Sequence, residues 1–162
     1  MEDVMDKTNA MRILDRKKIP YQAFEYDPQL TDGQSVAAEL GLEPDTVFKT
    51  LVTCAGGASY FVFVVPVIST LDLKKAAKAA GVKSLSMLKQ KDLFPLTGYV
   101  HGGCSPLGMK KALRTFIHAS ALGMPQICVS AGRRGMQIRV EPSALAGAAG
   151  ASFADLTADE VQ

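Results

Sequence analysis

A single lysine interrupts an apolar run of the kind that forms buried β-strands. Lys49 lies in the middle of residues 47–51, Val-Phe-Lys-Thr-Leu. Because successive strand residues point to opposite faces, Lys49 shares a face with Val47 and Leu51. An ammonium group among apolar neighbours costs free energy unless an anion compensates. The pattern indicates either a lysine that reaches solvent from a sheet edge or a cation at the mouth of a binding pocket.

Two glycine-rich segments could hold a carbonyl oxygen or a phosphate. They are residues 102–108, Gly-Gly-Cys-Ser-Pro-Leu-Gly, and residues 130–135, Ser-Ala-Gly-Arg-Arg-Gly. Each follows a predicted strand and combines backbone freedom with a hydroxyl group, so main-chain N–H groups could approach a ligand closely. Neither segment has the spacing of a P-loop or a dinucleotide fingerprint. Taken singly, each is more often a turn than a site.

The sequence offers little for nucleophilic catalysis. It lacks a GxSxG motif, and its two histidines, His101 and His118, both fall on strand-like segments. Cys104 is close to His101 in the chain, but catalytic cysteines and histidines usually come together from distant segments. We therefore do not expect Cys104 to be a nucleophile.

The cysteines also argue against a metal site. Cys54, Cys104 and Cys128 are odd in number, form no CxxC pair, and have no histidine at metal-ligand spacing. They are interpreted as reduced thiols. We expect neither a metal nor another cofactor.

Length and composition are typical of one globular domain. The chain has 162 residues, of which 48% are hydrophobic and 21% charged. The acidic start, Met1 to Val4, is unlike a secretory leader, and the longest apolar run, residues 60–68, is far shorter than the about 20 residues of a membrane helix. We expect a cytoplasmic protein without a membrane partner.

The net charge is only +2, but the basic residues cluster in the middle and second half of the chain. They are Lys74, Lys75, Lys78, Lys83, Lys89, Lys91, Lys110, Lys111, Arg114, Arg133, Arg134 and Arg139. The common interpretation is a set of solvated helix faces, and the alternative is one basic surface for an RNA backbone.

The elements that would position these residues alternate between strands and short helices. Predicted helices end near Lys17, run from an Asp32 or Ser35 cap to Gly41, run from Asp72 to Gly81, and begin at Pro142. Predicted strands cover residues 21–26, 98–100, 114–118, 126–130 and 136–140, and residues 47–53 and 60–67 form a hairpin around Gly56-Gly57. We expect a single α/β (α+β) domain over residues 1–162, with a mixed, mostly antiparallel sheet or partial barrel covered by helices.

Five segments, taken together and in this order, resemble the YbaK/EbsC family of free-standing Cys-tRNA(Pro) deacylases. This family is related to the editing domain of bacterial prolyl-tRNA synthetases. The segments are residues 47–51, 71–78, 97–99, 102–111 and 130–135, and the match in order and spacing extends from about Ile13 to Leu156.

The resemblance implies an enzyme that removes cysteine mistakenly attached to tRNA(Pro). Cysteine and proline are similar in size, and a hydrophobic pocket separates such neighbours poorly. In this family the substrate's own thiol attacks the ester and leaves as a cyclic thiolactone, so no enzyme nucleophile or cofactor is required.

The resemblance also implies roles for particular residues by position. Lys49 would be the essential lysine, which orients the terminal adenosine and its phosphate or stabilises charge at the ester. Tyr26 matches a pocket tyrosine of the family. By the same resemblance, Gly102, Gly103 and Ser105 would surround the aminoacyl group, and Ser130 and Gly132 would form the opposite wall.

The chain departs from the family pattern at three places, which bear on substrate preference. Gln137 replaces an acid found in some members, His101 replaces an aliphatic residue or arginine, and His118-Ala119 replaces a commonly acidic pair.

Two alternatives remain open from the sequence. The chain could deacylate another mischarged tRNA, carrying alanine or serine, or it could be a non-catalytic RNA-binding module associated with a synthetase. Because the net charge is modest, we expect prolyl-tRNA synthetase to supply much of the tRNA affinity. The protein is expected to be a monomer or a homodimer.

Overall fold

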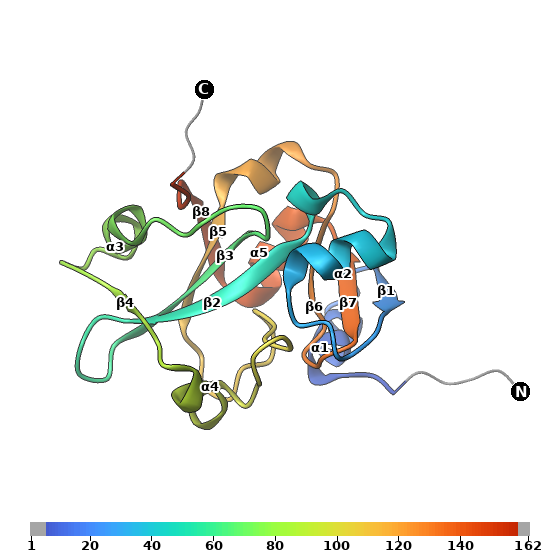
Figure 1. Cartoon of the computed structure of the whole chain (residues 1–162), viewed down its shortest axis with the longest axis horizontal. Coiled ribbons are helices and arrows are strands. Elements are labelled where there is room, and N and C mark those ends of the chain that lie inside the picture. Colours follow the sequence, from blue (N-terminus) through green and yellow to red (C-terminus); the bar gives the residue numbers. More distant parts are fainter. Residues whose placement is uncertain (1–5, 159–162) are drawn as a thin grey trace, which may run out of the picture.

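The computed structural model describes residues 6–158 and arranges them as two β-sheets with short helices packed against them (Figure 1). The acidic N-terminal residues 1–4 lie outside this range. The first sheet has the order β1-β7-β6, formed by Tyr21–Glu25, Met136–Val140 and Ile127–Ser130. The second has the order β4-β2-β3-β5-β8, formed by Ser86–Met87, Phe48–Cys54, Tyr60–Pro66, Arg114–His118 and Ala151–Ala154.

Antiparallel and parallel pairing both occur. The pairs β3–β5 and β5–β8 are parallel, and the other strand pairs are antiparallel. The predicted mixed, mostly antiparallel α/β fold is confirmed, and the described strands form two open sheets rather than a closed barrel.

The two sheets meet at the start of β2. Val47 forms an isolated parallel bridge with Cys128 of β6, and its carbonyl oxygen accepts a hydrogen bond from the Val67 N–H at 2.8 Å. Because β2 begins at this junction, Lys49 lies within two residues of the place where the sheets join.

Strand β3 is the centre of the larger sheet, as its uninterrupted apolar run predicts. Phe63 and Val65 pack with Ala76 and Ala77 of α3, whereas Val64 packs in the cluster that contains residues of β6, β7, α1 and α5. Both faces of β3 are thus covered by packed side chains.

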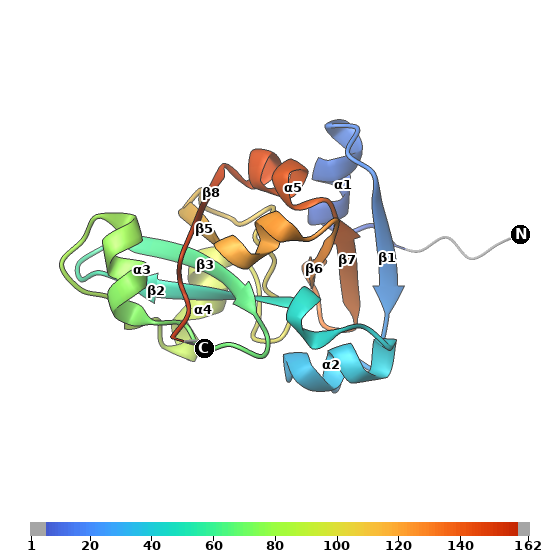
Figure 2. The same cartoon turned by 90° about the horizontal axis from the view of Figure 1, so that it is seen from above.

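The helices are α1 Asn9–Arg16, α2 Gly33–Leu40, α3 Leu73–Ala80, α4 Gln90–Thr97 and α5 Pro142–Ala149, with 3-10 turns at Pro44–Thr46 and Ala119–Gly123. In Figure 2, α1 and α5 lie on one side of the smaller sheet and α2 lies on the other. The predicted caps are confirmed for α2 and α3, where Asp32 and Asp72 accept hydrogen bonds from the first-turn N–H groups and Gly41 and Gly81 end the helices in left-handed conformations.

Residues 98–100 are not a strand, so that prediction is wrong. Gly98 is instead the left-handed residue that ends α4, a helix that sequence patterns did not reveal because Pro95 lies inside it and no side chain caps its start. Strands β4 and β8 were also missed. They are two and four residues long, too short to give a periodic pattern.

Within residues 6–158, every helix is too short or too polar to cross a lipid bilayer.

Candidate active site

A cavity of about 440 Å³ opens where the two sheets meet. Its walls come from β2, from the end of β6, from β7, from the start of α2 and from the segment that follows α4. This volume lies within the range of about 300–1,000 Å³ that is usual for small-ligand sites. The junction of the sheets creates the hollow because it brings strand ends and loops from both sheets to one place.

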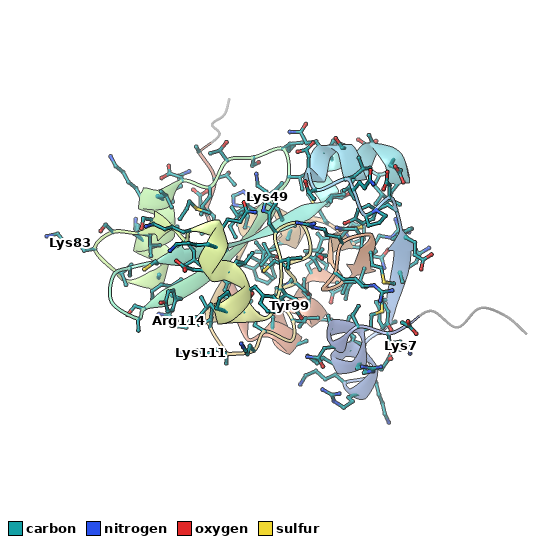
Figure 3. All side chains as sticks on the ribbon, turned by 60° about the horizontal axis from the view of Figure 1, so that its bottom comes forward. Lys7, Lys49, Lys83, Tyr99, Lys111 and Arg114 are labelled. Atoms are coloured by element: carbon teal, nitrogen blue, oxygen red, sulfur yellow. The ribbon has the colours of Figure 1, made fainter. Side chains whose placement is uncertain are left out.

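Lys49, on β2, is one of the residues that form the wall of this cavity. In Figure 3 it lies near the middle of the molecule, whereas Lys83 and Lys111 lie at its periphery. Its backbone pairs with Val65 of β3, and the side chain is half-buried. At residue 49, β2 pairs with β3 but not with β4, which reaches only residues 53–54, so Lys49 lies near a sheet edge as well as at the cavity.

Burial lowers the pKa of the Lys49 ammonium below its ordinary value, and the Asp32 carboxylate partly opposes this by raising it. The Asp32 carboxylate is engaged at the start of α2, where it accepts hydrogen bonds from the N–H of Ser35 at 3.1 Å and from its Oγ at 2.9 Å. Among residues 6–158, no salt bridge involves Lys49. Its charge is therefore available to an anionic or carbonyl ligand.

The cavity brings together four of the seven residues that the resemblance assigns to a site. Lys49, Tyr26, Gly102 and Ser130 line it, although they come from four separate segments of the chain. The remaining three, which are Gly103, Ser105 and Gly132, are not among the lining residues.

Gly103 lies where the two glycine-rich segments touch. A β-carbon on it would come within 2.9 Å of the Arg134 nitrogen and 3.0 Å of the Arg133 carbonyl carbon, which are backbone atoms. The Arg134 Nε also donates a hydrogen bond to the His101 carbonyl oxygen at 2.8 Å. The two glycine-rich segments thus pack closely against each other. Gly103 does not line the cavity, but its contact with residues 133–134 helps to hold together the two segments that do.

Gly132 and Ser105 belong to the same two glycine-rich segments, but they contact neighbouring protein groups instead of lining the cavity. A β-carbon on Gly132, whose φ is +108°, would contact the Tyr99 ring at 3.2 Å. The Tyr99 hydroxyl donates a hydrogen bond to the Leu107 carbonyl oxygen. Ser105 is fully buried, and its Oγ accepts a hydrogen bond from the Leu107 N–H at 3.2 Å.

Ser130 differs from Ser105 because its side chain lines the cavity. Its Oγ accepts a hydrogen bond from the Gly132 N–H at 3.2 Å. This contact leaves the hydroxyl proton free to be donated to a ligand.

Cys104 and His101, the two groups with potential for nucleophilic chemistry, both line the cavity, but neither is activated there. Burial raises the pKa of the Cys104 thiol to about 12, so the thiol is protonated near neutral pH. His101 lines the cavity but is exposed, and no hydrogen bond joins its ring to Cys104 or Ser130 within the described part of the chain. His118 lies on β5, where its Nδ1 accepts a hydrogen bond from the Leu156 N–H at 3.1 Å.

Among residues 6–158, no group of three His, Cys, Asp or Glu side chains is close enough to hold a metal ion. The polar groups at the cavity include the Lys49 ammonium, the Asp32 carboxylate, and hydroxyl and backbone groups.

Sequence reasoning missed two polar residues of the cavity. Asp32 was predicted as a helix cap only, and Thr50 was not singled out, but both line the cavity. Gln137 was noted only as a departure from the family pattern, and it too lines the cavity. Its position between the buried Met136 and Ile138 is the same signal that drew attention to Lys49, a polar residue inside an apolar strand.

Comparison with known proteins gives one family and several relatives. Residues 27–148 match the family described as the aminoacyl-tRNA editing domain. The chain is 45% identical over 156 residues to a protein of Enterococcus faecalis provisionally named Cys-tRNA(Pro)/Cys-tRNA(Cys) deacylase EbsC, and the match covers 95% of each chain.

Solved structures share the fold. One, provisionally described as a trans-editing enzyme for prolyl-tRNA synthetase, is 24% identical with a TM-score of 0.81 and covers 96% of this chain and 100% of that one. Another, described only as a hypothetical protein, is 19% identical with a TM-score of 0.85 and covers 93% of this chain and 99% of that one.

Proposed function

This chain belongs to the family of aminoacyl-tRNA editing domains, and on that premise we propose that it is a trans-editing deacylase that removes cysteine from mischarged tRNA(Pro). The whole chain would act as one catalytic unit in the cytoplasm, without a cofactor. The relative at 45% identity, named as a deacylase of cysteinyl-tRNA, supports the choice of amino acid.

The observation that carries the proposal is the half-buried Lys49 in a cavity that Gly102 and Ser130 also line. A cavity of about 440 Å³ has room for an aminoacyl group and part of the terminal nucleoside. The ammonium would either bind the phosphate of the terminal adenosine or stabilise negative charge at the ester carbonyl. Hydrogen-bond donors aimed at developing charge are each worth about 3 kcal/mol in comparable sites.

The reaction that fits this cavity uses the substrate's thiol. The cysteine sulfur attacks the ester carbonyl carbon, the bond from that carbon to the ribose oxygen breaks, and the thiol proton is transferred to the ribose oxygen. The products are a cyclic thiolactone and tRNA with a free hydroxyl group. A protonated Cys104 and the absence of a histidine-activated nucleophile among residues 6–158 agree with a route that needs no enzyme nucleophile.

A second candidate substrate is suggested by the name of the same relative, which includes Cys-tRNA(Cys). A small cavity can contact the aminoacyl group and the terminal nucleoside, which are the same in both cysteinyl-tRNAs. Under this proposal the chain itself recognises cysteine, and the choice of tRNA(Pro) depends on prolyl-tRNA synthetase, which presents its own misacylated product.

The synthetase would also compensate for weak electrostatic attraction. A net charge of +2 gives little overall attraction to tRNA at physiological salt. We expect deacylation of Cys-tRNA(Pro) to be faster when the synthetase is present, with the deacylase acting as a monomer or a homodimer. Equal rates with and without the synthetase would remove this part of the proposal.

The decisive experiment is deacylation of Cys-tRNA(Pro), Cys-tRNA(Cys), Ala-tRNA(Pro) and Ser-tRNA by the purified protein and by Lys49→Ala. We expect deacylation of the two cysteinyl-tRNAs alone, and loss of that activity in Lys49→Ala with an unchanged circular dichroism spectrum. Release of alanine or serine at similar rates would exclude the thiol-dependent route. A wild-type rate for Lys49→Ala would exclude the proposed site.

A further inference from the structure

Two cavity-lining residues each carry a buried side-chain oxygen that has no hydrogen-bond partner among residues 6–158. These oxygens are Oε1 of Gln137 and Oγ1 of Thr50. Gln137 is only 7% exposed. Buried polar atoms in folded proteins nearly always have a partner, because an unpaired one loses its hydrogen bonds to water without replacement. An orphaned amide oxygen at a cavity wall is satisfied by whatever fills the cavity, either a ligand or an ordered water.

The fold fixes the position of the Gln137 side chain. Residue 137 lies on β7, the central strand of the smaller sheet, with Phe24 of β1 and Ser130 of β6 as its cross-strand neighbours. Its chain neighbours Met136 and Ile138 point to the opposite face, where they belong to the main core. Gln137 therefore shares the cavity side of the sheet with Ser130.

The charges around the cavity restrict what this acceptor can bind. Lys49 is a cation without a salt-bridge partner among residues 6–158, so its charge attracts the ester and phosphate oxygens of the proposed substrate. A positively charged group of the substrate is repelled from Lys49; the Asp32 carboxylate also lines the cavity, but it acts on Lys49 and accepts hydrogen bonds from the N–H and Oγ of Ser35. Gln137 supplies an acceptor from β7 in the other sheet, while Lys49 comes from β2.

We propose that Gln137 Oε1 accepts a hydrogen bond from the α-ammonium group of the aminoacyl moiety and so makes the site selective for α-amino acyl esters. This inference rests on the proposed deacylase function. The α-ammonium is the strongest hydrogen-bond donor of a cysteinyl group, since a thiol is only a weak donor. Holding the ammonium at Gln137 also leaves the thiol free to attack the ester carbonyl.

The test compares two substrates that differ only in the α-amino group, cysteinyl-tRNA(Pro) and 3-mercaptopropionyl-tRNA(Pro). Both carry the thiol and the ester. We measure kcat/KM for the wild-type protein and for Gln137→Met, which has a similar shape but no strong acceptor. Taking the ratio of variant to wild type on each substrate cancels the different intrinsic reactivity of the two esters.

We expect Gln137→Met to lose about 10- to 100-fold on the cysteinyl substrate, as for a hydrogen bond to a charged group. On the 3-mercaptopropionyl substrate the loss should be less than about twofold, because the missing contact is absent there anyway. Equal losses on both substrates, or no loss on either, would overturn the inference. Gln126→Leu is a matched control, since Gln126 is exposed and does not line the cavity.

Two further measurements keep the inference testable. If Gln137→Met does not fold, Gln137→Glu retains an acceptor and should still prefer the cysteinyl substrate at least as strongly as the wild type, whereas a lost preference would contradict the inference. The wild-type protein alone tests the premise that the chain is a deacylase. If it releases neither acyl group, the deacylase function has failed; if it is active and the Gln137→Met losses are equal, only the role of Gln137 has failed.

Discussion

The α-carbon of Gly103 lies directly against the backbone of Arg133. A β-carbon at position 103 would stand 3.0 Å from both the carbonyl carbon and the α-carbon of Arg133. Two glycine-rich segments that are separated by more than twenty residues in the sequence thus meet backbone to backbone. The contact explains how Gly103 can matter for the cavity without lining it.

Gly103→Ala should separate the two segments. Backbone atoms cannot rotate away as a flexible side chain can, so overpacking here should cost about 1–3 kcal/mol of unfolding free energy. Because Gly102 and Ser130 are carried by the same segments, we also expect deacylation to fall by about tenfold or more, as for small misplacements of binding groups. Urea unfolding and the deacylation rate measure the two effects.

Gly147→Ala provides the matched control for this substitution. Gly147 is exposed within α5, and a β-carbon there would have nothing within 4 Å. The change should raise the unfolding free energy by about 0.5–1 kcal/mol, because alanine loses less backbone entropy than glycine in a helix. Activity should stay at the wild-type level. Similar effects from both alanine substitutions would contradict the role given to the Gly103 contact.

Sequence patterns gave reliable predictions where one residue type has one physical role. Asp32 and Gly41 bracket α2, and Asp72 and Gly81 bracket α3, because capping needs only a local hydrogen bond and a positive φ. Strand alternation placed Lys49 on one face with Val47 and Leu51 but left open whether it reaches solvent from a sheet edge or lies at a pocket, and the structure places it among the residues that line the cavity.

The rest could not be predicted because it depends on contacts between distant segments. Ser105 and Ser130 look alike in sequence, each in a glycine-rich turn, yet Ser105 is fully buried and Ser130 lines the cavity. The difference arises from how the segment that follows α4 packs on residues 133–134, which no local pattern encodes. The division of the strands into two sheets, joined by the Val47–Cys128 bridge, is equally a tertiary feature.

Lys49→Met should reduce deacylation by at least about 100-fold while leaving the protein as stable as the wild type or more stable at neutral pH. The folded-state pKa of Lys49 is lowered by burial, so the folded protein holds this proton less tightly than the unfolded chain does. The charged side chain therefore opposes folding at pH values below its folded pKa. This penalty disappears as the pH rises from the folded pKa towards the ordinary value of about 10.4.

Thermal unfolding of the wild-type protein and of Lys49→Met between pH 7 and pH 10.5 checks the direction of the Lys49 pKa shift. The stability advantage of Lys49→Met should shrink as the pH increases, and wild-type activity should decline over the upper part of the same range as the ammonium loses its proton. An advantage that grows with pH would mean that the Lys49 pKa is raised in the folded protein rather than lowered.

Cys104→Ala should leave deacylation within about threefold of the wild-type rate, far less than the loss of about 10³-fold or more that follows removal of a catalytic nucleophile. Burial keeps the Cys104 thiol protonated near neutral pH, with a pKa of about 12. For the same reason iodoacetamide should modify Cys104 slowly in the folded protein and rapidly in urea. A loss of more than 100-fold in a correctly folded Cys104→Ala protein would mean that the thiol takes part in the reaction.

Ser130→Ala and Ser105→Ala should have different effects although each removes one hydroxyl that accepts a backbone hydrogen bond. Ser130 Oγ accepts from Gly132 and faces the cavity, whereas the Ser105 Oγ accepts from Leu107 and is enclosed by protein. Each substitution should lower the unfolding free energy by about 1 kcal/mol, the usual contribution of such a bond.

Only Ser130→Ala should also lower kcat/KM on cysteinyl-tRNA(Pro), by about tenfold, since it removes a donor to the bound aminoacyl group. Ser130→Thr, which retains the hydroxyl, should recover part of that activity, whereas a structural defect alone would give no such recovery. Assays below the unfolding temperature of each variant separate the two effects. The two variants can be compared by the activity that each loses for each kcal/mol of unfolding free energy that it loses. If this ratio were the same for both, the two hydroxyls would act only by holding the glycine-rich turns in shape. The hydrogen-bond donor at this wall of the cavity would then have to be a backbone N–H.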